Sequence, residues 1–240
     1  MTPFISIPRS VIVAADVSDI HACACLANAV RGVPKIGGFK LGLTMGLKGL
    51  VAAVESVRFN FKAPTTIICD YQKAGNDIPE MGKKFAHEVK TAGCDGAILF
   101  PFAGPVTQLA WTKACQDVGL RVLVGLVMTH EQFLLSEGGY VADNAPERTF
   151  RTACAQGVVD FVVPGTKIKW VETLRAILVE ELGENGFTLY APGFVTQGGD
   201  ISECGKAAGE RFHPIVGSAI YNQKTPAAMR LAAIQATSKL

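Results

Sequence analysis

Short apolar runs recur along the chain, and each is followed by a segment in which apolar residues return every three or four positions. Apolar runs without polar alternation are typical of strands buried on both faces, and the wider spacing is typical of amphipathic helices. The runs predict strands at 11–16, 36–41, 65–70, 96–100, 121–127, 158–163, 187–191 and 213–216. The chain is therefore expected to alternate regularly between strand and helix.

The segments between these runs predict helices, several of which end at a glycine or a proline. They cover 19–30, 47–57, 78–92, 106–118, 146–156, 170–182, 203–208 and 226–240. Eight strand–helix units predict a (β/α)8 barrel, the TIM barrel, built as a single domain from residues 1–240. An open doubly wound sheet is the alternative, but no Gly-x-Gly-x-x-Gly motif follows the first strand. Residues 128–143 are expected to form a longer, mobile connection.

The composition, 49% hydrophobic and 18% charged over 240 residues, indicates a large buried core. A net charge of +2 without a basic run or an acidic tail favours a small-molecule ligand over nucleic acid or an anionic membrane surface. No apolar run approaches the length of a membrane span, and the first ten residues lack the pattern of a signal peptide. We therefore expect a cytoplasmic protein with neither a nucleic-acid nor a membrane partner.

Seven cysteines are scattered through apolar segments of the chain. Because an odd, dispersed set does not suit a disulfide framework, we expect them to be small buried hydrophobic side chains in a reducing compartment. Cys23 and Cys25 have no second pair of Cys or His residues at metal-ligand spacing, so a zinc site is not expected.

Charged residues come directly after the first three predicted strands. Asp16 ends the first, Lys40 lies near the end of the second, and Asp70, Lys73 and Asp77 follow the third. The carboxyl ends of all strands meet at the active face of a barrel, so these charges are expected to converge there. Lys73 between two acids lets both carboxylates stay ionised, and the acids keep Lys73 charged and able to donate a proton. The alternatives are a helix cap at Asp16, a solvent-directed Lys40 and a solvated loop of weak ion pairs.

Two glycine-containing segments stand at the ends of the seventh and eighth strands, at 191–200 and 215–221. Barrels commonly bind phosphate at these two loops through backbone N–H groups, and glycine lets the backbone approach the anion closely. The alternative is a pair of tight turns that merely require glycine.

Thr129 and His130 follow the fifth predicted strand, and both can donate hydrogen bonds to a polar ring. His130 is more simply explained as a structural imidazole. No nucleophile elbow is present, so a Ser-His-Asp or Cys-His triad has no support.

Taken together, these motifs resemble the orotidine 5′-phosphate decarboxylase family, and the resemblance spans nearly the whole chain. It rests on Asp16, Lys40, the acid–lysine–acid block ending in Asp77-Ile78-Pro79, Met128-Thr129-His130, Pro192-Gly193-x-x-x-Gln197-Gly198-Gly199-Asp200 and Val216-Gly217-x-Ala219-Ile220-Tyr221. The loop from Pro192 to Asp200 is the more specific signal, because related decarboxylases and aldolases of the superfamily share the acid–lysine–acid block but not this loop.

The resemblance implies a homodimeric barrel that converts orotidine 5′-monophosphate to uridine 5′-monophosphate and CO2 in pyrimidine biosynthesis, without a metal or an organic cofactor. It implies four catalytic residues: Asp70 facing the substrate carboxylate, Lys73 protonating the ring carbon, Asp77 reaching across from the partner subunit, and Lys40 in the charge network. It implies substrate-binding roles for Asp16 and Lys40 at the ribose, Thr129 at the pyrimidine, Pro192 in the loop after strand seven, and Gln197, Gly217 and Ser218 at the phosphate.

The chain departs from the family pattern in the acid–lysine–acid block. The usual spacing is Asp-x-Lys-x-x-Asp, whereas here Asp70 and Asp77 lie one residue further from Lys73 on each side. The usual lysine position falls on Gln72 when counted from Asp70 and on Ala74 when counted back from Asp77.

The phosphate and ribose positions also depart from the family. Ser218 replaces the customary arginine, and Met81 stands where the family often has threonine. Because an arginine makes bidentate, charge-assisted contacts, we expect weaker phosphate binding or a cation supplied from elsewhere. Two alternatives stay open: a magnesium-dependent sugar-phosphate decarboxylase or aldolase on the same barrel, and a catalytically inactive nucleotide-phosphate-binding protein.

Overall fold

The computed structural model describes residues 3–194 and 198–240, without the side chains of Gln72 and Lys73. Eight parallel strands pair in chain order and close into a barrel, which confirms the predicted fold and excludes the open sheet. The strands are β1 (Val11–Ala14), β2 (Ile36–Leu41), β3 (Thr66–Ala74), β4 (Gly96–Leu99), β5 (Arg121–Gly125), β6 (Asp160–Val162), β7 (Thr188–Ala191) and β8 (Phe212–Val216).

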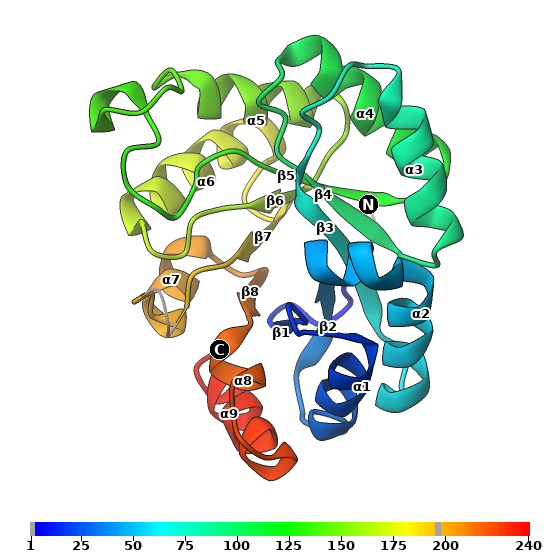
Figure 1. The fold of residues 1–240 in the computed structure, drawn as a ribbon. Coiled ribbons are helices and arrows are strands. Elements are labelled where there is room, and N and C mark those ends of the chain that lie inside the picture. The colour runs from blue at the N-terminus through cyan, green and yellow to red at the C-terminus, as the bar shows by residue number, and fades with distance from the viewer. Residues whose placement is uncertain (1–2, 195–197) are drawn as a thin grey trace.

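The helices surround the barrel in chain order, so that the last lies beside the first (Figure 1). They are α1 (Ile20–Ala29), α2 (Leu43–Phe61), α3 (Met81–Thr91), α4 (Pro105–Asp117), α5 (Ala145–Ala155), α6 (Ile168–Leu182), α7 (Ile201–Ala208), α8 (Ser218–Tyr221) and α9 (Pro226–Ser238). None of the helices in these described residues is long and apolar enough to cross a membrane.

One predicted helix boundary and one predicted strand boundary are each wrong by four residues. The helix expected at 47–57 begins at Leu43, and Gly49, with φ of 122°, kinks it inside the segment that looked regular. The third strand continues to Ala74 instead of stopping at residue 70, because its end pairs with β4. The connection 128–143, whose mobility stays a prediction, folds back through a bridge between Leu134 and Val141.

Apolar side chains fill the barrel and also the space between strands and helices. Ile12, Ile68, Ile98 and Ile215 point into the barrel, while their strand neighbours pack beneath the helices. Both faces of each strand are therefore buried, which explains why the strands appear in the sequence as continuous apolar runs.

The amino end of the barrel contains a cluster of buried polar side chains that the sequence pattern does not reveal. The Tyr190 hydroxyl donates to Asp160 Oδ1 over 3.1 Å, and Arg121 Nε donates to Asp160 Oδ2 over 2.6 Å. Next to Tyr190, the His213 ring lies 2.8 Å from the Ser10 hydroxyl through Nδ1. Burial lowers the pKa of His213 to about 3, so this imidazole is neutral in the folded protein.

We expect His213 to make the fold sensitive to acid. The unfolded chain binds a proton at His213 below the ordinary pKa of 6.5, whereas the folded chain does so only near 3. Stability from this residue is therefore lost as the pH falls from 6.5, by about 1.4 kcal/mol per pH unit. Urea unfolding of the wild type and His213→Gln at pH 7 and pH 5 tests this. The variant should lose less stability between the two pH values, and equal losses would contradict the assignment.

Candidate active site

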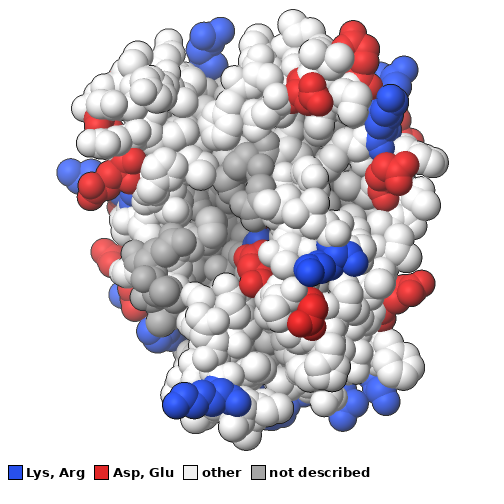
Figure 2. Space-filling view, in the orientation of Figure 1, with Lys and Arg blue, Asp and Glu red and all other residues white. Residues whose placement is uncertain are grey.

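A cavity of about 320 Å³ opens at the carboxyl ends of the strands. Its lining includes seven residues singled out in the sequence: Asp16, Lys40, Asp70, Thr129, Pro192, Gly217 and Ser218. The space-filling view shows one face of the molecule hollowed near its middle, where acidic and basic side chains meet (Figure 2). The barrel thus brings together residues that lie up to 202 positions apart in the printed sequence.

Three of these residues form a charge network on neighbouring strand ends. Lys40 Nζ lies 3.1 Å from Asp16 Oδ2 and 3.0 Å from Asp70 Oδ2. Lys40 and Asp70 are buried, with side chains 7% and 9% exposed, whereas Asp16 is 36% exposed. Burial by itself would lower the pKa of Lys40, but the carboxylates of Asp70 and Asp16 outweigh it and raise that pKa. Lys40 is therefore a buried, permanently charged ammonium at neutral pH.

The residue at position 42 has to be small because of this network. Gly42 precedes α2, and a Cβ built there would overlap Asp16 Oδ1 and lie 3.3 Å from Lys40 Nζ. The missing side chain leaves the space that the Asp16 carboxylate occupies.

The remaining wall of the cavity is largely apolar, and apart from Met128 no sequence motif pointed to it. Ile98, Phe100, Met128, Val162 and Ile215 line it, from β4, β6 and β8 and from the segments that follow β4 and β5. Their inward positions at strand ends were the available signal, but the same residue types fill any barrel core. A wall of this kind can contact the flat faces of a ring and exclude water.

Tyr221 adds a phenol to the cavity next to the network. Burial raises its pKa, and the Asp16 carboxylate adds to this. A Cβ at Gly217 would lie 3.2 Å from Tyr221 Cε1. The sequence placed Tyr221 in a motif without assigning it a role.

The lengthened acid–lysine–acid block is absorbed in a bulge of β3. Cys69 pairs with Ala97 of β4, but the next pair is Ala74 with Leu99. Five steps along β3 thus match two along β4, so three residues bulge from the ladder between Asp70 and Ala74. The Lys73 backbone lies in this bulge, and its side chain is outside the described part of the chain.

Asp77 is separated from the other predicted residues within this chain. It is exposed and lines a different cavity, of about 790 Å³, on the outer side of the barrel between α2 and α3. Its Oδ1 accepts a hydrogen bond from Ile78 N over 2.7 Å. Asp77 therefore does not line the cavity that holds Lys40 and Asp70 of the same chain.

The loop after β7 closes on itself beside the cavity. Gly199 N donates to Gly193 O over 3.1 Å, and Gly193 and Gly198 have φ of 107° and 88°, a region that favours glycine. Asp200 caps α7 by accepting from Glu203 N. Gln197 lies outside the described residues. Lys40 is the one Lys or Arg among the described lining residues, and positions 195–197 contain none.

The described residues contain no group of three or more His, Cys, Asp and Glu side chains placed to hold a metal ion. All seven cysteines are free, and five of them are buried. Burial raises the pKa of Cys23 to about 11 and that of Cys115 to about 12, so these thiols stay protonated. This agrees with the expected role of most cysteines as small hydrophobic side chains.

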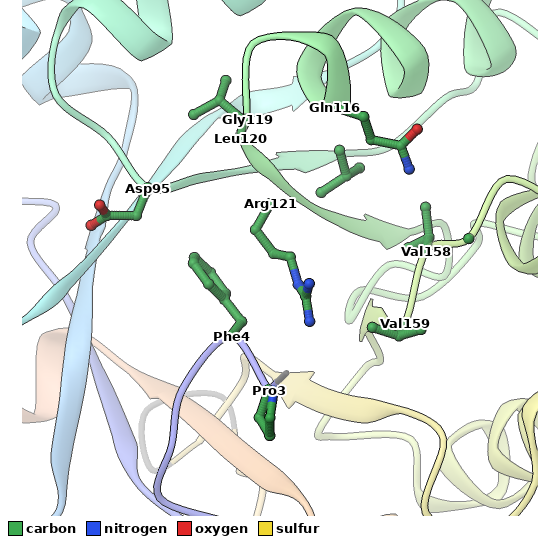
Figure 3. A pocket seen from close by; sticks show the side chains of 11 residues that line it. Pro3, Phe4, Asp95, Gln116, Gly119, Leu120, Arg121, Val158 and Val159 are labelled. Atoms are coloured by element: carbon green, nitrogen blue, oxygen red, sulfur yellow. The ribbon is translucent and has the colours of Figure 1, made fainter. Parts of the chain in front are cut away.

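Another cavity, of about 500 Å³, lies at the amino end of the strands. Phe4 and Arg121 lie beside each other there (Figure 3), with the guanidinium carbon 6.0 Å from the ring centre. Arg121 is also paired with Asp160 at the amino end of the barrel. We therefore interpret this cavity as a gap left where the amino-terminal segment packs against the barrel, and not as a ligand site.

Comparison with known proteins decides the family. A relative from Methanosarcina barkeri, named orotidine 5′-phosphate decarboxylase, is 31% identical over 228 residues, which are 92% of this chain and 92% of the relative. The chain belongs to the orotidine 5′-phosphate decarboxylase family. A relative of the same name from Methanosarcina mazei is 29% identical over 216 residues, covering 90% of this chain and 89% of its own. No protein-family model matches the chain.

Solved structures of other members of the orotidine 5′-phosphate decarboxylase family share the fold. The enzyme from Methanocaldococcus jannaschii, crystallised with the inhibitor BMP, superposes with a TM-score of 0.80 at 21% identity over 97% of this chain and 98% of its own. The enzyme from Pyrococcus horikoshii gives a TM-score of 0.75 at 23% identity over 95% and 98%. At these identities the likeness establishes the barrel.

Proposed function

We propose that this chain is a carboxy-lyase that converts orotidine 5′-monophosphate to uridine 5′-monophosphate and CO2, a step of pyrimidine biosynthesis. The observation that carries the proposal is a buried lysine held between two carboxylates that line the cavity, in a member of this family. We also propose a cytoplasmic location, in keeping with the free thiols. As the resemblance implies, the reaction uses no metal and no organic cofactor.

Asp16 and Lys40 bind the ribose hydroxyls in this proposal, and Thr129 contacts the pyrimidine. The apolar wall opposite them suits a flat ring. Asp70 faces the substrate carboxylate. Its Oδ1 is buried without a hydrogen-bond partner among the described atoms, and its Oδ2 is paired with Lys40.

Loss of CO2 leaves an electron pair on a ring carbon, and no cofactor absorbs it. Fixed positive charge in a pocket shielded from water stabilises such a transition state more than the same charge does in solution. Lys73 supplies that charge and then the proton. Asp70 disfavours the bound carboxylate more than the transition state that loses it, and only such a difference accelerates the step.

The phosphate binds at the loop after β7 and at the start of α8. Pro192, Gln197, Gly217 and Ser218 are its proposed contacts. Because Ser218 replaces an arginine, the phosphate relies on backbone N–H groups and neutral side chains more than is usual in the family.

The function is tested directly by mixing the purified chain with orotidine 5′-monophosphate and following the ultraviolet absorbance. Loss of the orotidine signal with formation of the uridine nucleotide, unaffected by a chelator, is expected. An activity that the chelator stops would favour the magnesium-dependent alternative. Calorimetric binding of uridine or 6-azauridine monophosphate without turnover would support the inactive binding protein.

We further propose a homodimer in which Asp77 completes the active site of the partner subunit. Two observations support it: Asp77 lines a cavity outside its own barrel, and large apolar side chains near it are exposed. Those side chains are Tyr71, Ile78, Val106 and Leu109, between 46% and 66% exposed. A second copy covering them would bury apolar area and bring Asp77 to another site.

Hybrid dimers test whether Asp77 acts across the interface. Asp77→Asn and Lys73→Ala subunits are each expected to form dimers at least about 10²-fold less active than wild type. Co-expressed with different tags and purified as the heterodimer, they should regain half the wild-type kcat. One of the two sites then has Lys73 from one subunit and Asp77 from the other. An inactive heterodimer would contradict the proposal, because it would show that Asp77 does not act in the active site of the partner subunit.

A further inference from the structure

Three hydrogen bonds fix residues 76–78 to the next βα unit, two at backbone carbonyls and one at the side chain of Asn76. Thr107 Oγ1 donates to Asp77 O over 3.0 Å, and Trp111 Nε1 donates to Ile78 O over 3.1 Å. On the other side, Phe102 N donates to Asn76 Oδ1 over 2.8 Å. Three consecutive residues are thus held by the β4–α4 loop and by α4.

Thr107 and Trp111 lie four positions apart, on one face of α4 (Pro105–Asp117). Both are buried, with exposures of 4% and 6%. Trp111 also contacts the start of α3, where a Cβ at Gly82 would come within 2.9 Å of its ring. Its ring lies 5.1 Å from that of Phe85. The two donors therefore belong to the rigid packing between α3 and α4.

We propose that Thr107 and Trp111 are positioning residues for Asp77, and that they act on the active site of the partner subunit. This rests on the proposed function and dimer. The Asp77 side chain is exposed and accepts a hydrogen bond from the adjacent Ile78 N. Its direction is thereby tied to the backbone that Thr107 and Trp111 hold. The two α4 side chains prevent the lengthened block from relaxing at its outer end.

Substitutions at Thr107 test this positioning role more specifically than substitutions at Trp111, because they can remove the hydroxyl donor alone. Valine has the same shape but cannot donate, so Asp77 O loses its partner and the block can shift. Serine keeps the donor. Because small displacements of catalytic groups have large effects on rate, Thr107→Val should lower kcat by roughly tenfold, and Thr107→Ser should stay within about twofold of wild type. Urea unfolding checks that both variants are folded.

The proposal makes a specific prediction for hybrids. In a heterodimer of Thr107→Val with Lys73→Ala, the site that retains Lys73 receives Asp77 from the subunit with an intact Thr107. That site should work at the wild-type rate, giving half the wild-type kcat per dimer. A heterodimer in which that site stays as slow as in the Thr107→Val homodimer would overturn the proposal.

Trp111→Phe gives a second variant in case Thr107→Val does not fold, since phenylalanine keeps a ring but lacks the N–H. It should show the same slowed homodimer and the same recovery with Lys73→Ala. Equal activity of Trp111→Phe, Thr107→Val and wild type would also refute the positioning role. If the wild-type chain itself does not decarboxylate orotidine 5′-monophosphate, the proposed function has failed instead, so the two failures are distinguishable.

Discussion

Replacing Lys73 by alanine is expected to abolish decarboxylation of orotidine 5′-monophosphate, lowering kcat/KM by about 10⁴-fold or more while the protein stays folded. The expected loss combines two effects: proton donation, typically worth 10²–10⁴-fold, and stabilisation of developing negative charge, typically 10²–10³-fold. Absorbance assays of the variant against wild type measure it. Substantial residual turnover would refute the assignment of Lys73.

The neighbouring position supplies a matched control, because the usual family spacing counted from Asp70 falls on Gln72. If Lys73 is the catalytic residue, Gln72→Ala should keep activity within a few-fold of wild type. The double variant Gln72→Lys/Lys73→Ala moves the ammonium by one position along β3. It should stay inactive, because the ammonium then starts from a different backbone position, and small displacements of a catalytic group have large effects on rate. Recovery of activity in the double variant would show that the bulge does not fix which of the two positions presents the catalytic lysine.

The charge network was predictable because it follows from one rule about the fold. Once the apolar runs indicate a parallel barrel, residues after the strands must meet at one end, whatever their separation in sequence. Asp16, Lys40 and Asp70 each end an apolar run, and the structure places them within salt-bridge distance. The same rule placed Thr129 and Gly217 at one cavity.

The path of the chain between Asp70 and Asp77 was not predictable from this rule. Extra residues in a strand can either extend the following loop or bulge out of the ladder, and the sequence does not distinguish these. Pairing of Ala74 with Leu99 decides for the bulge. For the same reason, the exit of Asp77 toward the outer cavity could be expected only from the family resemblance, which assigns it to a partner subunit.

The buried polar side chains at the amino end of the barrel could not be predicted, for a different reason. Asp160 stands inside one predicted strand and His213 begins another, and a single polar residue in an apolar run does not indicate which partner it will contact. The partners, Arg121 and Ser10, come from distant strand starts. Such pairs become visible only when the closed barrel brings the amino ends together.

Removing the ammonium of Lys40 is expected to affect both stability and catalysis. In Lys40→Met, the buried Asp70 carboxylate loses the cation 3.0 Å away, and Asp16 loses the same partner. Removing one member of a buried ion pair typically costs about 3–5 kcal/mol. Urea unfolding at pH 7 should show a loss of this size. Turnover should fall by at least about 10²-fold, because the proposed ribose contact and part of the positive field disappear.

The pH dependence of stability and a double variant distinguish the loss of the Lys40 charge from a loss of side-chain packing. The raised pKa of Lys40 contributes stability that is present below its ordinary value of 10.5 and is lost as the pH rises above it, so wild type should show this alkaline loss and Lys40→Met should not. Lys40→Met/Asp70→Asn should recover stability at pH 7 but no activity. A destabilisation that is independent of pH and unchanged by Asp70→Asn would show that Lys40 stabilises the barrel through its alkyl chain.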